Sequence, residues 1–174
     1  MRSIFYFVLI LFLSIGKQSL GSEPEVIQKV ELLRLVADIN NAVKNRDFAV
    51  ISLHMPKRLY KEMARRLNTT EKNLRDSFIK QLSVQFENLS LDAYHLDEKN
   101  IAYLQSNSGI LYALIPTTLK TKDRIIQYKT LAIFDKTQWY LIYGGQKTIQ
   151  NPIFLEIYPD FNNVQLPNKI IIKH

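Results

Sequence analysis

The chain has 174 residues, of which 47% are hydrophobic and 22% are charged. This composition excludes an intrinsically disordered protein, and the length allows one domain with a full hydrophobic core. The absence of cysteine excludes disulfides, cysteine-ligated metal sites and lipid attachment through an N-terminal cysteine.

The formal net charge is +7. Arg2 and Lys17 fall within residues 1–21, so the remaining chain has 21 basic against 16 acidic residues and a net charge of +5. Such a charge permits contact with anionic lipid head groups, cell-wall polymers or an acidic protein, although solubility is the simpler explanation. No basic run is longer than two residues, as at Arg65-Arg66, so nucleic acid is not an expected partner.

Residues 1–21 predict a secretory signal peptide. Met1-Arg2 is a basic start, Ser3 to Ile15 is apolar apart from its serines, and cleavage is expected after Gly16 or Gly21. The alternative is a membrane anchor, but a span needs about 20 apolar residues. We therefore predict one domain over residues 22–174, secreted or periplasmic, with membrane contact only through an uncleaved leader. The lack of disulfides favours a bacterial envelope.

The first half of the mature chain is predicted to be helical. A capping box at residues 22–25 opens a helix that runs to about Lys44, and Asp47 begins a short helix that ends near Met55. A third helix follows Pro56, and residues 71–87 form a fourth. The inward-facing positions are expected to be Val26, Val30, Leu33, Val36, Ile39 and Val43, then Phe48, Ile51 and Leu53, then Leu59, Tyr60, Met63 and Leu67, and finally Leu74, Phe78, Leu82 and Phe86.

The second half is predicted to be mainly strands. Residues 89–96, 101–105 and 110–116 have strand character, residues 117–123 read as a loop, and residues 124–143 form a long hairpin. Residues 153–158 are expected to form a short helix or turn on the sheet edge. The last segment, residues 163–174, is either an edge strand or a tail in contact with a partner.

The register of the hairpin follows from its turn. If the turn centres on Lys136-Thr137, Phe134 faces Trp139 and Ala132 faces Leu141. Because side chains alternate across a strand, one face is then the more apolar and should meet the helices. That face comprises Ile126, Tyr128, Thr130, Ala132, Phe134, Trp139, Leu141 and Tyr143. The opposite face carries Ile125, Gln127, Lys129, Leu131, Ile133, Tyr140 and Ile142, and it is expected to be open around Gln127, Lys129, Tyr140 and Ile142.

Three stretches carry a resemblance to a known family: the helix start Asp47-Phe48, the mid-sheet residues 112–116 (YALIP), and residues 139–145 (WYLIYGG). In this order they resemble the NTF2-like (cystatin-like α+β) superfamily, over roughly residues 25–160. The resemblance is one of architecture, without a diagnostic motif. It implies an α+β fold in which N-terminal helices pack on a curved antiparallel sheet to form a cone with a pocket. It also implies that Trp139, Leu141 and Tyr143 point into that pocket.

Two groups of residues are candidate sites. Tyr128, Phe134, Trp139 and Tyr143 could line a pocket for a small apolar ligand, although aromatic residues on an inward face more often fill a core. Gln127, Lys129 and Tyr140 could contact a protein partner. The predicted inner face has no carboxylate or histidine, so no catalytic, cofactor-binding or metal-binding residue is predicted, and this weighs against an enzyme. The basic residues of the third helix, Lys57 to Arg66, are a solvated face or a docking surface.

Three functions remain open, because the superfamily includes isomerases, dehydratases, secretion-system components and binding domains. The first, which we predict, is an exported non-catalytic interaction protein of the bacterial envelope that contacts another exported protein through its sheet face, with a filled cone. The second is a small-ligand binder with an open cone. The third is an isomerase or dehydratase whose base has not been located. The oligomeric state is also open, with a homodimer among the alternatives.

Overall fold

The computed structural model describes residues 24–173. The expected signal peptide, Ser22-Glu23 of the expected capping box and the terminal His174 lie outside the described residues. The elements follow in the order α1 (Val26–Lys44), α2 (Phe48–Leu53), α3 (Lys57–Arg66), α4 (Glu71–Phe86), β1 (Tyr94–Leu96), β2 (Ala102–Gln105), β3 (Leu111–Lys120), β4 (Arg124–Asp135), β5 (Gln138–Ile142), α5 (Gln146–Ile149), α6 (Pro152–Ile157), the 3₁₀ helix η1 (Pro159–Asn163) and β6 (Ile170–Lys173).

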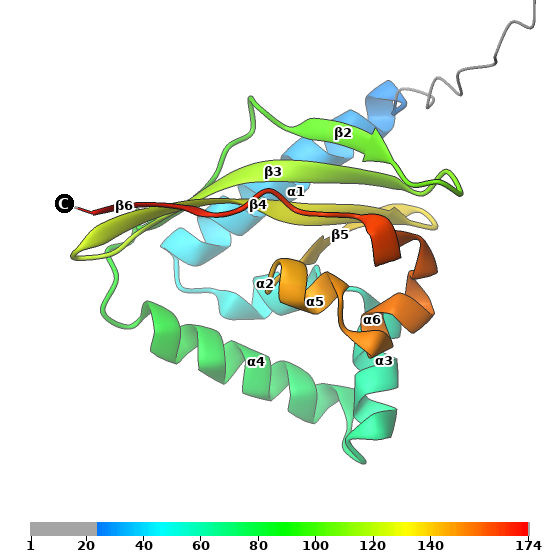
Figure 1. Ribbon diagram of the computed structural model, residues 1–174. Helices are drawn as coiled ribbons and strands as arrows, with labels where there is room; N and C mark the ends of the chain where they lie inside the picture. Colours follow the sequence, from blue (N-terminus) through cyan, green and yellow to red (C-terminus); the bar gives the residue numbers. More distant parts are fainter. Residues whose placement is uncertain (1–23, 174) are drawn as a thin grey trace, which may run out of the picture.

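The protein is α+β, with N-terminal helices followed by a strongly curled antiparallel sheet, as predicted (Figure 1). The central strands β3 and β4 pair over nine residues, Tyr112 to Lys120 against Ile125 to Ile133. Because a strand has only two edges, β1 and β2 share the other edge of β3. In the same way β5 and β6 share the other edge of β4. The sheet is therefore four strands wide, and each outer position is occupied by two short strands.

The hairpin register predicted from the sequence is confirmed. Phe134 pairs with Trp139 and Ala132 with Leu141, and Lys136 in the turn has a left-handed φ of 62°. The predicted inner face is also confirmed, because Ala132, Trp139 and Leu141 are buried in one core with residues of α1 and α2. We call this the first core.

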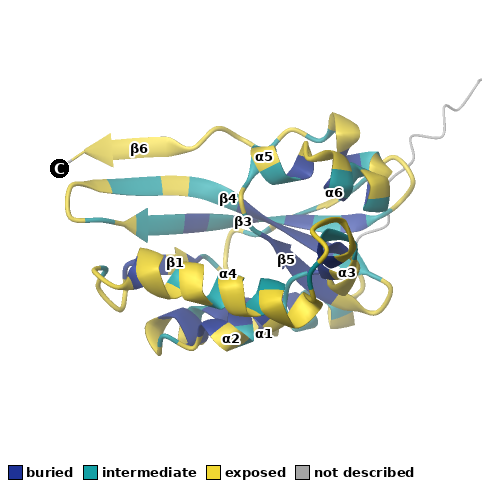
Figure 2. Ribbon diagram, turned by 90° about the horizontal axis from the view of Figure 1, so that it is seen from below, coloured by how far each residue is buried: buried dark blue, intermediate teal, exposed yellow. Residues whose placement is uncertain are grey.

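A second core lies on the opposite face of β4 and β5, where the sequence predicted an open surface. Leu131, Ile133 and Ile142 are buried there beneath Phe154 of α6 and Phe161 of η1. Figure 2 shows the consequence as a dark blue zone on β5 and the adjoining part of β4, whereas β6 is exposed. The expectation that this face is open is therefore wrong at the β5 end of the hairpin.

Several element boundaries differ from the predictions. The strand expected over residues 89–96 contains only Tyr94–Leu96. The residues between the end of α4 and Ala93 form turns instead. The loop expected from residue 117 starts only after Lys120, because Thr117 to Lys120 pair with Ile125 to Tyr128. Helix α1 is capped by Glu25, whose N–H donates to the Gln28 side chain at 2.9 Å. The last segment ends in an edge strand, one of the two predicted alternatives.

The inward faces of the helices are confirmed in part. In α1 the buried positions are Leu32, Leu35, Val36, Ile39, Ala42 and Val43, whereas Val26, Val30 and Leu33 are exposed. Leu53 and Leu67 are also exposed, because they lie where α2 and α3 end and the chain leaves the core. Helix α4 has only one buried residue, Phe86. Among residues 24–173, no helix combines the length and apolar character that crossing a membrane requires.

Candidate functional site

A cavity of about 450 Å³ lies against the inner face of the sheet, beside α4. Its volume is within the range of about 300–1,000 Å³ that is common for small-molecule sites. All of α1 to α4 contribute to the wall, together with β1, β3 and β4 and the segment after β5. The lining is mainly apolar and includes Ile39, Ile51, Leu59, Phe78, Leu82 and Leu119.

Helix α4 forms one wall of this cavity and is anchored mainly near its two ends. Near its start, Arg75 donates to the Ser52 carbonyl oxygen at 2.6 Å and lies 4.1 Å from the centre of the Tyr60 ring. At its end, the Phe86 ring packs at 5.5 Å from Phe48 and 5.9 Å from Tyr94. Between these anchors, Phe78 and Leu82 line the cavity and remain half-buried, with the Phe78 ring 6.0 Å from that of Tyr143. The middle of α4 therefore covers a space that it does not fill.

Three tyrosines from different strands supply the polar groups of the cavity wall. Tyr94 begins β1, Tyr128 lies on β4 and Tyr143 follows β5. The chain can turn directly after Tyr143 because Gly144 adopts a φ of 94°. A side chain at Gly144 would also collide with Thr148 Oγ1, since its Cβ would lie 2.1 Å from that atom. Gly144 thus lets α5 approach closely while Tyr143 faces the cavity.

The hydroxyls of Tyr94 and Tyr143 are buried and have no hydrogen-bond partner. Tyr94 lies near Tyr128 and Thr130, without the geometry of a hydrogen bond. The Thr130 hydroxyl lies 2.7 Å from that of Thr117, which donates to the Ile115 carbonyl oxygen at 3.0 Å. Buried polar groups in proteins are normally paired, so two unpaired hydroxyls in one cavity call for an explanation.

These tyrosines keep their protons at physiological pH. Burial raises the pKa of Tyr94 well above its ordinary value, and the neighbouring Tyr143 and Tyr128 raise it further. Burial also raises the pKa of Tyr143 and of Tyr128. Each hydroxyl is therefore neutral and can donate one hydrogen bond.

The described cavity lining contains no aspartate, glutamate, histidine, lysine or arginine. Its other polar side chains are Gln81 and Gln85 on α4 and Thr148 on α5. Within residues 24–173 there is also no cluster of three histidines and carboxylates that could hold a metal ion. The cavity wall therefore offers apolar surface and neutral hydrogen-bonding groups.

The structure divides the four residues predicted to bind a ligand. Tyr128 and Tyr143 line the cavity, whereas Phe134 and Trp139 lie elsewhere on the same sheet face. The Trp139 ring packs at 5.4 Å from Phe134 and 6.3 Å from Tyr103, and its Nε1 donates to the Gln28 carbonyl oxygen at 2.8 Å. Trp139 also borders a separate, more open cleft of about 400 Å³, which is lined by charged residues of both signs, including Arg34, Asp38 and Lys57. The hairpin tip is thus a packed aromatic cluster.

The residues predicted to bind a protein partner are placed unequally. Gln127 is exposed, Lys129 is half-buried and Tyr140 is only 8% exposed. A partner could therefore reach Gln127 directly, but only the edge of Tyr140. The binding role of these residues stays a prediction.

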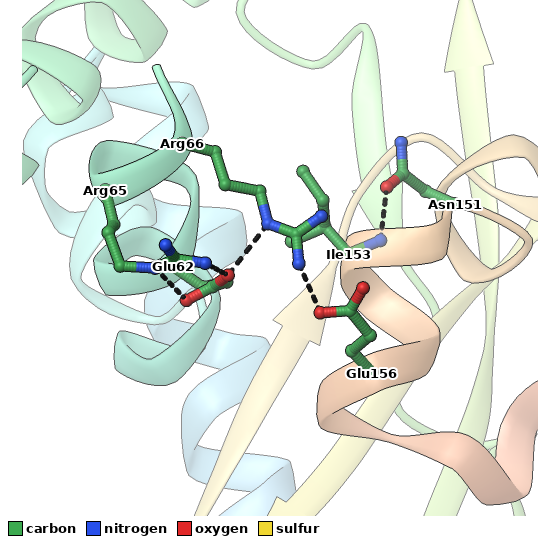
Figure 3. Close-up of polar contacts among 6 residues, drawn as sticks. All are labelled: Glu62, Arg65, Arg66, Asn151, Ile153 and Glu156. Atoms are coloured by element: carbon green, nitrogen blue, oxygen red, sulfur yellow. Dashed lines mark hydrogen bonds and ion pairs between the residues drawn. The ribbon is translucent and has the colours of Figure 1, made fainter. Parts of the chain in front are cut away.

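The basic residues of α3 include two arginines held in ion pairs (Figure 3). Glu62 accepts from Arg65 at 2.6 Å and from Arg66 at 2.8 Å, and Arg66 also pairs with Glu156 of α6. The hydrogen bonds from Arg65 and Arg66 lower the pKa of Glu62 to about 2. These contacts join α3 to α6, so Arg65 and Arg66 are held by acidic partners within the chain.

Tyr94 was not predicted as a site residue. The one available signal was its position two residues before Leu96, which puts both side chains on the same face of the strand. Both are indeed buried in the first core. The pairing of β1 with β3, which brings Tyr94 near Tyr128, joins residues more than twenty positions apart, and no local pattern specifies it.

Comparisons with known proteins do not assign this chain to a family. No protein-family model matches the sequence, no curated protein matches it, and no solved structure matches the fold.

Proposed function

We propose that this protein binds a small, mainly apolar molecule in the cavity beside α4. The observation that carries the proposal is the pair of buried, unpartnered hydroxyls of Tyr94 and Tyr143 in an otherwise apolar wall. Leaving a buried donor unpaired costs about 1–3 kcal/mol. A bound molecule with a polar group would offset this cost.

The volume and composition of the cavity support the same function. About 450 Å³ of space is large for a packing defect, because protein interiors contain few voids larger than a water molecule. Apolar pockets with a few convergent polar groups are the usual form of small-molecule sites. This function was the second of the three sequence-based alternatives, and the open cavity favours it over a filled cone.

We further propose that the fold is an NTF2-like cone and that the protein is exported. Helices α1, α2 and α4 pack over the inner face of a curled antiparallel sheet and enclose a pocket, which is compatible with such a cone. Export is supported by the basic start and apolar run of residues 1–21. N-terminal sequencing of the protein from its host should find a start at Lys17 or Ser22, and an intact Met1 would contradict export by cleavage.

The test of binding uses an uncharged fluorescent probe, N-phenyl-1-naphthylamine, titrated against the purified protein. Binding in the cavity should increase its emission and saturate. Leu82→Trp should block binding, because Leu82 is half-buried and lines the cavity. Val84→Trp is the matched control, since Val84 lies on the same helix but is 63% exposed and outside the lining. Equal probe binding by both variants would place the probe elsewhere and contradict the proposal.

A protein partner is a second candidate, favoured by the exposed edge strand β6. Ile170, Ile171 and Ile172 are 59%, 43% and 45% exposed, and Ile170 pairs with Gln127 of the predicted partner surface. Unpaired strand edges are sites where another chain can add a strand. If the edge binds another exported protein, Lys129→Glu and Ile172→Lys should each abolish its capture from the envelope fraction. Unchanged capture by both variants would refute this surface.

A further inference from the structure

We infer that the ligand of the cavity is an uncharged molecule with an apolar body and one carbonyl-type oxygen, which accepts hydrogen bonds from Tyr94 and Tyr143. This inference rests on the proposed function and specifies the class of ligand. It is argued from the hydroxyl groups, from the charges around the cavity and from its size.

The hydroxyl groups define the polar end of the ligand. Tyr94 and Tyr143 each have a donor without a partner, and they are electrostatic neighbours of each other and of Tyr128. A carbonyl oxygen has two lone pairs and can accept from two donors at once. A single oxygen of this kind, placed between the two hydroxyls, would satisfy both buried donors, whereas a hydrocarbon would satisfy neither.

The charges exclude an ionised head group. No cationic side chain lines the cavity. Arg46 and Arg75 lie over the rings of Phe86 and Tyr60, outside the lining, and donate to the carbonyl oxygens of Leu89 and Ser52, while Nη1 of Arg46 is buried without a partner. A carboxylate that entered would lose its hydration without gaining a cation, which strongly favours its neutral form. Since the tyrosines stay protonated, no phenolate is present to attract a cationic ligand instead.

The size limits the apolar body. A cavity of about 150 Å³ can hold benzene, so a cavity of about 450 Å³ can hold a molecule roughly three times as large. Medium-chain ketones and esters have this size, and they carry the required acceptor without charge.

The experiment compares three ten-carbon compounds as competitors of N-phenyl-1-naphthylamine: 2-decanone, decanoate and decane. At pH 7.5, 2-decanone should displace the probe at a concentration at least tenfold lower than decanoate. Lowering the pH to 5 should strengthen the binding of decanoate at least tenfold, because each pH unit above the pKa of a carboxyl group reduces the fraction in the neutral form about tenfold. The affinity of 2-decanone should not change with pH.

Variants identify the groups that bind the ketone. Tyr143→Phe and Tyr94→Phe should each weaken the binding of 2-decanone about threefold to tenfold, the range expected for loss of one neutral hydrogen bond. The binding of decane should not change. Tyr112→Phe is the matched control, because Tyr112 is half-buried in the second core, away from the cavity. It should change neither affinity.

The outcomes separate the two proposals. If decanoate at pH 7.5 binds as tightly as 2-decanone, or if both tyrosine variants bind 2-decanone like the unmodified protein, the ligand class is wrong while cavity binding stands. If the probe does not bind, or if it binds and none of the three compounds displaces it, both the ligand class and the proposed function are wrong.

Discussion

The two cores of this protein use aromatic side chains in different ways. In the second core, Phe154, Tyr158 and Phe161 pack with ring centroids 5.1 to 6.2 Å apart, and each is at most 2% exposed. In the first core, Tyr128 and Tyr143 border a cavity of about 450 Å³. The same chain thus packs one face of its sheet closely and leaves a space on the other. The cavity is a local property of the region beside α4.

The hydroxyl groups differ in the same way. Tyr158 in the second core donates to Asp135 at 2.9 Å, and Arg58 lies 3.6 Å from the same carboxylate. Tyr94 and Tyr143 at the cavity have no partner. The second core therefore has the features of a region that stabilises the fold, whereas the cavity retains buried groups that a ligand could satisfy. This difference can be tested by paired substitutions.

The largest effect is expected from removing an aromatic ring. Phe154→Ala should lower the free energy of unfolding by about 3–5 kcal/mol, because Phe154 is fully buried and its removal leaves a new void. Phe78→Ala should cost only about 1 kcal/mol, because Phe78 is half-buried and already faces an empty space. Urea unfolding followed by circular dichroism measures both values.

A third variant checks that the small loss of stability expected for Phe78→Ala comes from the position of Phe78 at the cavity and is not a general property of α4. Phe86→Ala on α4 should cost more than Phe78→Ala, because Phe86 is buried between Phe48 and Tyr94. Equal losses for Phe78 and Phe154 would mean that the cavity wall is packed as tightly as the second core. The comparison between the two cores would then fail.

A smaller effect is expected from removing single hydroxyls. Tyr158→Phe should cost about 1–2 kcal/mol, because it removes a hydrogen bond to the half-buried Asp135. Tyr143→Phe should leave the ligand-free protein unchanged or stabilise it by up to about 1 kcal/mol, because it removes a buried donor that has no partner. Thermal unfolding of the two variants side by side gives the sign of each change.

The direction of the stability change caused by Tyr143→Phe is the decisive observation. A gain in stability together with weaker binding would mark Tyr143 as a residue kept for binding. A loss as large as that for Tyr158 would show that the Tyr143 hydroxyl is satisfied in the folded protein, and it would remove the main support for the binding site.

The hairpin shows what the sequence could predict. Its register and its helix-covered face follow from the turn at Lys136-Thr137 and from alternation along the strands, and both are confirmed. These are local properties, because a turn of fixed length determines which residues are opposed. Trp139 and Leu141 could therefore be assigned to the first core.

The second core could not be predicted in this way. It depends on α5, α6 and η1 folding back over β4 and β5, and no local pattern in the sequence specifies where α6 and η1 pack. One signal was present in the sequence: Leu131 to Phe134 are four consecutive apolar residues, which is the pattern of a strand covered on both faces. Tyr140 was assigned to an open surface because this pattern was read as simple alternation. A pocket lined by Tyr128 and Tyr143 was among the predicted alternatives, but its extent could not be predicted, since it depends on where α4 lies.

The smallest effect is expected from the ion pairs that join α3 to α6. Helix α3 belongs to both regions, because Leu59 packs in the second core and also lines the cavity. Hydrogen bonds from Arg65 and Arg66 lower the pKa of Glu62 from 4.5 to about 2. A carboxylate with a lowered pKa contributes stability above its unfolded-state pKa and loses that contribution as the pH falls through its folded-state pKa. The contribution of Glu62 should therefore be complete above about pH 4.5 and lost by about pH 2.

Glu62→Gln tests this contribution. The variant should be slightly less stable than the unmodified protein at neutral pH, and the difference should shrink as the pH falls from about 4.5 to about 2. Added salt should reduce the difference at neutral pH, because exposed ion pairs are screened. If Glu62→Gln also weakens binding of N-phenyl-1-naphthylamine, the position of α3 against α6 influences the cavity. Unchanged binding would show that the second core and the cavity are energetically independent, so that the two cores differ in function as well as in packing.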